Sequence, residues 1–152
     1  MTKTRRVVIY TDGGCVPNPG VGGWAAVLLS GGRRREISGG DPESTNNRME
    51  LTAAIEGLRA ISAAKRLRVH LVSDSQYVLY GLQEWVANWI RNDWRKGKSS
   101  GSPPVKNVEL WKELYELSQA HDMSYEHVRG HTGHPENEEC DRLAVSAIDE
   151  LV

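Results

Sequence analysis

The sequence of 152 residues lacks any long apolar run, and it contains only two cysteines, Cys15 and Cys140. A helix that crosses a bilayer needs about 20 apolar residues, so we expect neither a membrane span nor a membrane partner. The first apolar run, at residues 7–10, is too short for the core of a signal peptide. Two cysteines cannot build a disulfide framework. These absences predict a soluble protein located in the cytoplasm.

The composition excludes several further structural classes. The hydrophobic fraction is 39% and the charged fraction 26%, with 15 glycines and 6 prolines. These values are close to the averages of globular proteins, which excludes collagen-like, disordered and coiled-coil chains. A chain of this length forms one domain with a hydrophobic core of its own. We therefore predict a single domain over residues 1–152.

The charge is close to balance but unevenly distributed. A net charge of −1 argues against a protein that simply coats nucleic acid. Residues 85–106 nevertheless hold five basic side chains and one acidic side chain, whereas residues 107–152 hold three basic and eleven acidic ones. The compact basic segment is a candidate contact for phosphate groups. A solvated loop would explain the same charges equally well.

Changes in the hydrophobic period predict the element order βββαβααβα. The expected elements are strands at residues 6–11, 24–29 and 33–38, a helix at 48–63, a strand at 69–72, helices at 75–90 and 110–117, a strand at 123–128 and a last helix at about 140–151. The polar segment 92–104 is expected to be a loop. This order predicts an α/β protein of the mixed α+β kind, in which helices cover a five-stranded mixed sheet.

Four carboxylates fall at the ends of these elements. Asp12 ends the first strand, Glu50 opens the first helix, Asp74 ends the fourth strand and Asp141 lies in the first turn of the last helix. Singly, each has an ordinary explanation: a turn residue, a capping box with Asn47, a helix cap and a favourable charge at a helix N-terminus.

Considered together, the four carboxylates favour a metal site. Clustered carboxylates repel one another unless a hard cation neutralises them. A ligand set made only of oxygens suits Mg²⁺, with Mn²⁺ as the alternative, better than it suits zinc. Two such ions can activate a water molecule and stabilise the leaving oxygen of a phosphodiester. That chemistry needs several carboxylates in one place.

Four strings of the sequence resemble type I ribonuclease H. They are YTDGGC at residues 10–15 followed by NPG at 18–20, TNNRME at 45–50, SDSQYV at 73–78, and GHTGHPEN at 130–137 followed by CD at 140–141. The strings come in the family's order and cover nearly the whole chain. Gly14 departs from the pattern, since many members have serine at that position. The resemblance implies the ribonuclease H-like fold.

The resemblance also implies an activity. It implies a hydrolase, an endonuclease that cleaves the RNA strand of RNA–DNA hybrids with two bound Mg²⁺ ions and leaves 3′-hydroxyl and 5′-phosphate ends. Such an enzyme would remove RNA primers and hybrids during replication, as a monomer with no obligate protein partner. The alternatives are a non-catalytic module that binds RNA–DNA hybrids and a related nuclease of the same fold that acts on DNA.

The resemblance assigns roles to individual residues. Asp12, Glu50, Asp74 and Asp141 match the metal-binding carboxylates, and His131 matches a loop histidine that helps proton transfer or product release. Without the resemblance, His134 competes for that role. The expected nucleic-acid contacts are Asn18, Thr45, Asn46, Asn47 and Gln76, joined by Trp85, Trp89, Arg91, Trp94, Arg95, Lys96 and Lys98 of a basic helix–loop protrusion at about residues 85–106. We expect the asparagines to serve turns and caps as well, and Trp85 and Trp89 to pack partly inward.

Overall fold

The computed structural model describes residues 6–61, 64–129 and 134–152, and their elements follow the predicted order. The strands are β1 (Arg6–Val16), β2 (Gly20–Ser30), β3 (Arg33–Ser44), β4 (Arg68–Ser73) and β5 (Asp122–His127). The helices are α1 (Asn46–Arg59), α2 (Gln76–Tyr80), the π-helical turn η1 (Gly81–Trp85), α3 (Val86–Arg91), α4 (Val108–Gln119) and α5 (Pro135–Asp149). Within the described ranges, no helix has the length and apolar character needed to cross a membrane.

The five strands form one mixed sheet in the order β3-β2-β1-β4-β5. The first three strands are antiparallel neighbours, whereas β4 pairs in parallel with β1 and β5 in parallel with β4. The prediction of a five-stranded mixed sheet is confirmed. Because β1 and β4 run in the same direction side by side, the residues that follow them emerge at the same edge of the sheet.

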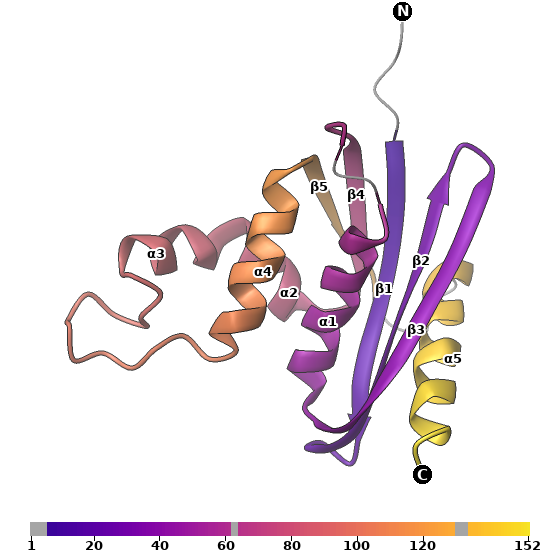
Figure 1. Ribbon diagram of the computed structural model, residues 1–152, viewed down its shortest axis with the longest axis horizontal. Helices are drawn as coiled ribbons and strands as arrows, with labels where there is room; N and C mark the ends of the chain where they lie inside the picture. Colours follow the sequence, from indigo (N-terminus) through magenta and orange to yellow (C-terminus); the bar gives the residue numbers. More distant parts are fainter. Residues whose placement is uncertain (1–5, 62–63, 130–133) are drawn as a thin grey trace, which may run out of the picture.

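Helices cover both faces of this sheet (Figure 1). Ala26 and Leu28 of β2 pack in the larger core with α1, α2 and α4, whereas Ala25 and Val27 pack with Cys140 and Ala144 of α5. Successive side chains of a strand point to opposite faces, so α1 and α5 lie on opposite sides of the sheet. This arrangement brings both helices close to β1, the central strand.

The first three strands are longer than the apolar pattern predicts. β1 continues through Gly13 and Gly14 to Val16, and β2 begins at Gly20 rather than at residue 24. The prediction that the first strand ends at Asp12 is therefore wrong, because Asp12 lies inside β1. These glycines stay in the ladder because Gly14 pairs with Gly23 across the two strands, and backbone hydrogen bonds do not require apolar side chains.

The start of α1 also differs from the prediction. Thr45 is the N-cap, and its hydroxyl accepts a hydrogen bond from the amide of Arg48 at 3.2 Å. The predicted capping box of Asn47 and Glu50 is wrong, since both residues lie inside the helix. Glu50 is consequently not needed at the helix end, and its side chain is buried instead.

The predicted helix at residues 75–90 is divided by the π-helical turn η1. The division begins at Gly81, where a Cβ would lie 1.9 Å from Cη2 of the fully buried Trp111. The chain thus approaches Trp111 more closely than any side chain permits. Beyond this turn, α3 and the loop after it project to one side of the sheet (Figure 1).

We predict that Gly81→Ala destabilises the protein. Alanine in a helix is worth about 1 kcal/mol more than glycine, but overpacking a buried ring costs about 1–3 kcal/mol or more. Because the contact would be only 1.9 Å, the cost of the clash exceeds the gain in helix propensity, and the net effect is a loss of stability. Urea denaturation should show a lower midpoint for Gly81→Ala. In Gly101→Ala the new Cβ meets nothing nearer than 3.8 Å, so an equal decrease in that control would contradict the explanation.

Candidate active site

Three of the four predicted carboxylates meet at one edge of the sheet. Asp12 lies in β1, Glu50 in α1, and Asp74 follows the last residue of β4. Each offers one oxygen, and these three oxygens all lie within 4.8 Å of one another. We call Asp12, Glu50 and Asp74 the carboxylate cluster. Such a cluster is a set of ligands that could hold a metal ion.

Strand register brings the two aspartates together. Thr11 of β1 is paired in parallel with Ser73 of β4, so Asp12 and Asp74 are the next residues along two neighbouring strands. Sequence reasoning placed both at strand ends. The parallel pairing explains why two segments 62 positions apart in the chain deliver their carboxylates to one place.

Gly13 brings the third carboxylate to the cluster. A Cβ at Gly13 would lie 2.5 Å from the carbonyl carbon of Met49 and 2.8 Å from the amide nitrogen of Glu50. Only glycine allows α1 to lie this close to β1. The amide of Gly13 donates to Oε1 of Glu50 at 2.6 Å and to Oδ1 of Asp12 at 2.9 Å. A glycine that the sequence pattern assigns to a turn therefore orients two of the three carboxylates.

Burial and mutual repulsion make the cluster bind protons when no cation is bound. Burial and the charge of Asp74 raise the pKa of Asp12 to about 7, although hydrogen bonds from Glu50 and Gly13 oppose the rise. Burial and the charges of Asp74 and Asp12 raise the pKa of Glu50 well above its usual value. Both groups are more than nine-tenths buried.

One oxygen atom of the cluster is suited to bind a cation because it has no other partner among the described residues. Oε2 of Glu50 is buried, and within the part of the chain that the structure describes it has no hydrogen-bond partner. A buried carboxylate oxygen without a partner is costly unless a cation or a proton satisfies it. The donor set consists of carboxylate oxygens, the ligands that hard divalent cations prefer.

Asp141 and His134 are not among the three residues of the cluster. Asp141 is the seventh residue of α5, so the prediction that it lies in the first turn of the last helix is wrong. Its charge contributes to the raised pKa of Asp12, which places it near the cluster, but it is not one of the three residues within 4.8 Å. His134 is the N-cap residue of α5 and is partly buried. His131 lies outside the described residues.

A family model described as RNase H matches residues 4–149 of this chain. The chain belongs to the ribonuclease H family. The ribonuclease H of Methylococcus capsulatus is 51% identical to it over 153 residues, which span 100% of this chain and 96% of that protein.

Two solved structures of ribonucleases H resemble the fold. LC9-RNase H1, a type 1 RNase H with the type 2 active-site motif, gives a TM-score of 0.86 at 33% identity, covering 100% of this chain and 76% of that one. LC11-RNase H1 in complex with an RNA/DNA hybrid gives a TM-score of 0.71 at 23% identity, covering 95% of this chain and 97% of that one. At 23% identity, the similarity to LC11-RNase H1 concerns the fold alone.

Four of the predicted polar contacts, Asn18, Thr45, Asn46 and Asn47, lie at the start of α1 and on the β1–β2 connection next to it, whereas Gln76 is the first residue of α2. Oδ1 of Asn18 accepts a hydrogen bond from the amide of Asn46 at 3.1 Å, and Oδ1 of Asn46 accepts one from the amide of Cys15 at 2.7 Å. These bonds hold the β1–β2 connection against α1, as expected from turn chemistry. Asn18, Asn46 and Asn47 are exposed, and the side chain of Thr45 caps α1.

The three predicted tryptophans form part of an aromatic row. Ring centroids are 5.9 Å apart for Trp85 and Trp89, 6.5 Å for Trp89 and Trp94, and 5.2 Å for Trp89 and Trp111. Trp85 is exposed, whereas Trp89 and Trp94 are partly buried. Trp111, which the sequence marked only as an apolar helix residue, thus supports the base of the basic segment.

The basic side chains of that segment differ in their exposure and in their hydrogen bonds. Lys96 and Lys98 are exposed, and Arg91 bonds to Asn88 within α3. Arg95 donates to the carbonyl of Ser102 at 3.1 Å across the loop. Hydrogen bonds from Lys96 to Pro103 and from Val105 to Trp94, both 2.9 Å between backbone atoms, close this loop. Arg95 therefore holds the loop in shape, while Arg91, Lys96 and Lys98 extend from it.

Sequence reasoning missed a second residue at the cluster edge. His127 ends β5, and its Nε2 lies 3.2 Å from the carbonyl oxygen of Asp74. His127 is paired with Ser73 in the parallel ladder, which accounts for the contact. The register of β4 and β5 could have suggested it, but neither His127 nor Asp74 carries a sequence signal for this bond.

We predict that Asp12→Asn raises the stability of the metal-free protein above neutral pH. An unfolded aspartate titrates near pH 3.9, whereas Asp12 in the fold titrates at about 7. Between these values the folded state binds more protons than the unfolded state, so the free energy of unfolding falls as the pH rises. The neutral amide removes this penalty, which for a difference of about three pKa units is on the order of 4 kcal/mol.

Thermal unfolding in a chelating buffer measures this effect. At pH 8 Asp12→Asn should melt at a higher temperature than the unchanged protein, and at pH 4 the difference should vanish. Asp149→Asn, at the exposed end of α5, is the control and should melt like the unchanged protein at both values. A lower melting temperature for Asp12→Asn at pH 8 would mean that repulsion in the cluster is not the dominant cost.

Proposed function

We propose that this protein is a divalent-metal-dependent endonuclease that cleaves the RNA strand of RNA–DNA hybrids. Membership of the ribonuclease H family gives the activity class, a hydrolase acting on phosphodiester bonds. The observation that carries the metal dependence is the carboxylate cluster, with the orphaned Oε2 of Glu50 inside it. A non-catalytic hybrid-binding module would have no need to hold three repelling carboxylates together with two of them buried.

In this proposal Asp12, Glu50 and Asp74 hold the cation, and Asp141 supplies a fourth carboxylate from α5. Mg²⁺ fits an all-oxygen ligand set, with Mn²⁺ as the alternative, and two ions take part once the substrate is bound. Bound ions of this kind activate water and stabilise the leaving oxygen of a phosphodiester. The products would carry 3′-hydroxyl and 5′-phosphate ends.

The chain's own groups prepare the site. The Gly13 amide fixes the orientation of Glu50 and Asp12, and the carbonyl of Asp74 is held by His127. Fixed ligands need no rearrangement when the charge of the transition state develops. His131 is proposed to help proton transfer or product release.

The substrate would be held by two surfaces. Asn18, Thr45, Asn46, Asn47 and Gln76 lie on elements next to the cluster and would contact the hybrid backbone or its minor groove. The basic segment, with Trp85 and the side chains beyond it, projects from the sheet (Figure 1) and would hold the DNA strand. Contacts to phosphate position a duplex, and contacts to 2′-hydroxyls distinguish RNA from DNA.

The remaining parts of the proposal concern the protein in the cell. One catalytic domain over residues 1–152, with a protrusion at about 85–106, would act as a monomer in the cytoplasm and remove RNA primers and hybrids during replication. These statements are predictions from the sequence and its resemblance.

Asp74→Asn is predicted to abolish nearly all cleavage while hybrid binding persists. The substitution removes one charge from the cluster, and removing such electrostatic stabilisation costs on the order of 10³-fold in turnover. Binding to the hybrid relies on other groups, so its dissociation constant should change little. Cleavage of a labelled hybrid at saturating Mg²⁺, together with binding in a chelating buffer, measures both. Asp149→Asn is the matched control, and a normal rate in Asp74→Asn would overturn the assignment.

We predict that neutralising the projecting basic side chains weakens binding in a salt-dependent way. The variant carries three alanines, at Arg91, Lys96 and Lys98. The slope of log affinity against log salt should become shallower by about 0.9 for every phosphate that these side chains neutralise in the unchanged protein. The Michaelis constant should rise, and turnover at saturation should change much less, because ground and transition states share this binding.

The control for this variant removes the same charge from the opposite end of the sheet. It carries alanines at Arg6, Arg33 and Lys65, which are all exposed. Steady-state kinetics at several salt concentrations should give a flattened slope only for the first variant. Equal slopes for the two variants would show that the basic segment is a solvated loop.

A further inference from the structure

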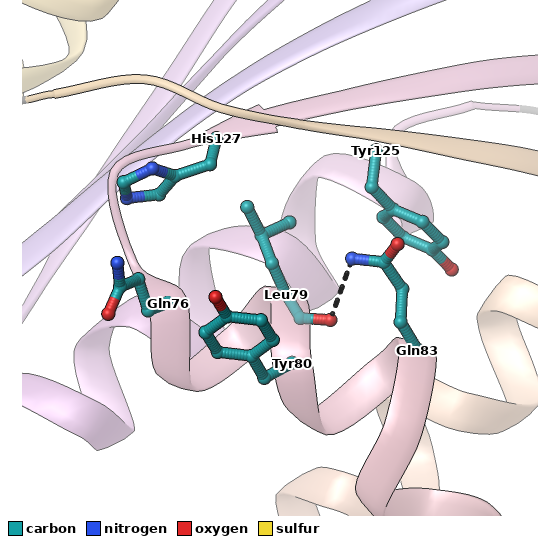
Figure 2. A pocket seen from close by; sticks show the side chains of 6 residues that line it. All are labelled: Gln76, Leu79, Tyr80, Gln83, Tyr125 and His127. Carbon is teal, nitrogen blue, oxygen red and sulfur yellow. Dashed lines mark hydrogen bonds between the residues drawn. The ribbon is translucent and has the colours of Figure 1, made fainter.

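A small pocket lies beside the carboxylate cluster and has no part in it. Its volume is about 110 Å³, and its walls come from α2, η1 and β5 (Figure 2). The lining residues are Gln76, Leu79, Tyr80, Gln83, Tyr125 and His127. Among these, only Gln76 was singled out by the sequence. The other five have no role in the function proposed above, apart from the bond of His127 to Asp74.

The walls are aromatic with polar edges. The rings of His127 and Tyr80 face the pocket from opposite sides, with Gln76 at one edge and Leu79 between them (Figure 2). Leu79 is 3% exposed and forms an apolar floor, whereas Tyr80 is 46% exposed. The amide of Gln83 is fixed, because its Nε2 donates to the carbonyl of Leu79 at 3.1 Å.

These walls select a planar, uncharged ligand. None of the six lining residues is a carboxylate, a lysine or an arginine, so the pocket offers no dedicated partner for a phosphate group. An enclosed apolar cavity of about 150 Å³ holds one benzene ring; this pocket offers about 110 Å³ and is open to solvent, so a planar ring that enters it would be only partly enclosed. Aromatic faces with amide groups at the edge are the means by which proteins bind unstacked nucleobases.

The position of the pocket connects it with the cleavage site. His127 contacts the carbonyl of Asp74 at 3.2 Å, and Gln76 is two residues beyond Asp74 in the chain. The pocket therefore begins where the carboxylate cluster ends. The pocket is thus next to any nucleic-acid strand that is bound at the cluster.

We propose that this pocket binds an unpaired nucleobase of the RNA strand, one that leaves the duplex next to the cleavage site. This inference rests on the proposed function, which identifies the bound strand as RNA. Its consequence is a preference for junctions, where paired RNA continues as single-stranded RNA. The base would stack between the Tyr80 and His127 rings, and the Gln76 amide would meet its polar edge.

The test compares two hybrids that differ only at one end. One is fully paired, and in the other the RNA strand continues beyond the DNA as a few unpaired nucleotides. Removing the stacking of a base on one aromatic side chain weakens binding by roughly tenfold. Tyr80→Ala should therefore raise the Michaelis constant for the extended hybrid about tenfold and leave that for the paired hybrid unchanged.

Two control variants isolate the ring. Tyr80→Phe keeps the ring and should restore the preference for the extended hybrid. Val145→Ala removes an exposed apolar side chain of α5 that does not line the pocket, and it should behave as the unchanged protein. If Tyr80→Ala affects both hybrids equally, or neither, the pocket does not bind an unpaired base.

A direct binding measurement separates this proposal from the proposed function. Adenosine has no phosphate, so its binding in a chelating buffer reports on the pocket and not on the metal site. The Tyr80 and Trp85 rings are 6.4 Å apart, so the tryptophan fluorescence can report the titration. Saturable binding that Tyr80→Ala weakens about tenfold supports the pocket even if no hybrid is cleaved. Hybrid cleavage with no adenosine binding at millimolar concentration overturns the pocket and leaves the proposed function standing.

Discussion

The mutual repulsion of three clustered carboxylates, two of them buried and one partly buried, is the interaction on which the rest of this structure depends. Asp12, Glu50 and Asp74 place oxygens within 4.8 Å of one another, and burial raises the pKa of Asp12 and Glu50 instead of relieving the strain between charges. Such an arrangement persists only when the surrounding structure holds it. The close approach of α1 to Gly13, the parallel pairing of β1 with β4 and the bond from His127 to Asp74 all act to hold it.

A second set of contacts connects the basic segment to α1, the helix that carries Glu50. Arg48 of α1 donates to Oδ1 of Asn107 at 3.1 Å, and Asn107 donates to the hydroxyl of Tyr77 at 3.2 Å. Trp111 donates to the same hydroxyl at 2.9 Å and packs against Trp89. Residues in the first turn of α1, at the start of α4 and in the aromatic row are thereby joined. The projecting segment is anchored to the helix that carries Glu50.

Much of this architecture could be predicted from local patterns, and the exceptions have physical causes. The alternating and helical spacing of apolar residues predicted the element order, because each strand or helix buries one of its faces. The capping box was wrong because Thr45 was available two positions earlier and its hydroxyl bonds to Arg48. The π-helical turn could not be predicted, since it depends on Trp111, 30 positions away from Gly81.

The candidate site likewise contains features that the sequence could predict and features that depend on the fold. The four carboxylates could be recognised in the sequence from their predicted places near the ends of strands and helices, and three of them, Asp12, Glu50 and Asp74, do lie together. The amide of Gly13 and the ring of His127 could not, because their roles depend on strand register and on the distance between α1 and β1. Asp141 was placed in the wrong turn of α5, since the helix begins at Pro135 and the apolar stripe becomes visible only later. The metal-binding role of the four carboxylates stays a prediction.

The distribution of the site along the chain affects when the protein becomes active during its synthesis. The cluster draws on residues 12, 50 and 74, and the central strand that carries Asp12 is covered on its second face by α5. α5 follows the other described elements in the chain, so a ribosome makes it after them. Until α5 packs on β1 and β2, Ala25 and Val27 lack the apolar side chains of Cys140 and Ala144 on that face. The sheet that carries the cluster is therefore covered on its second face only after this helix has been synthesised, and we expect the site to become functional no earlier.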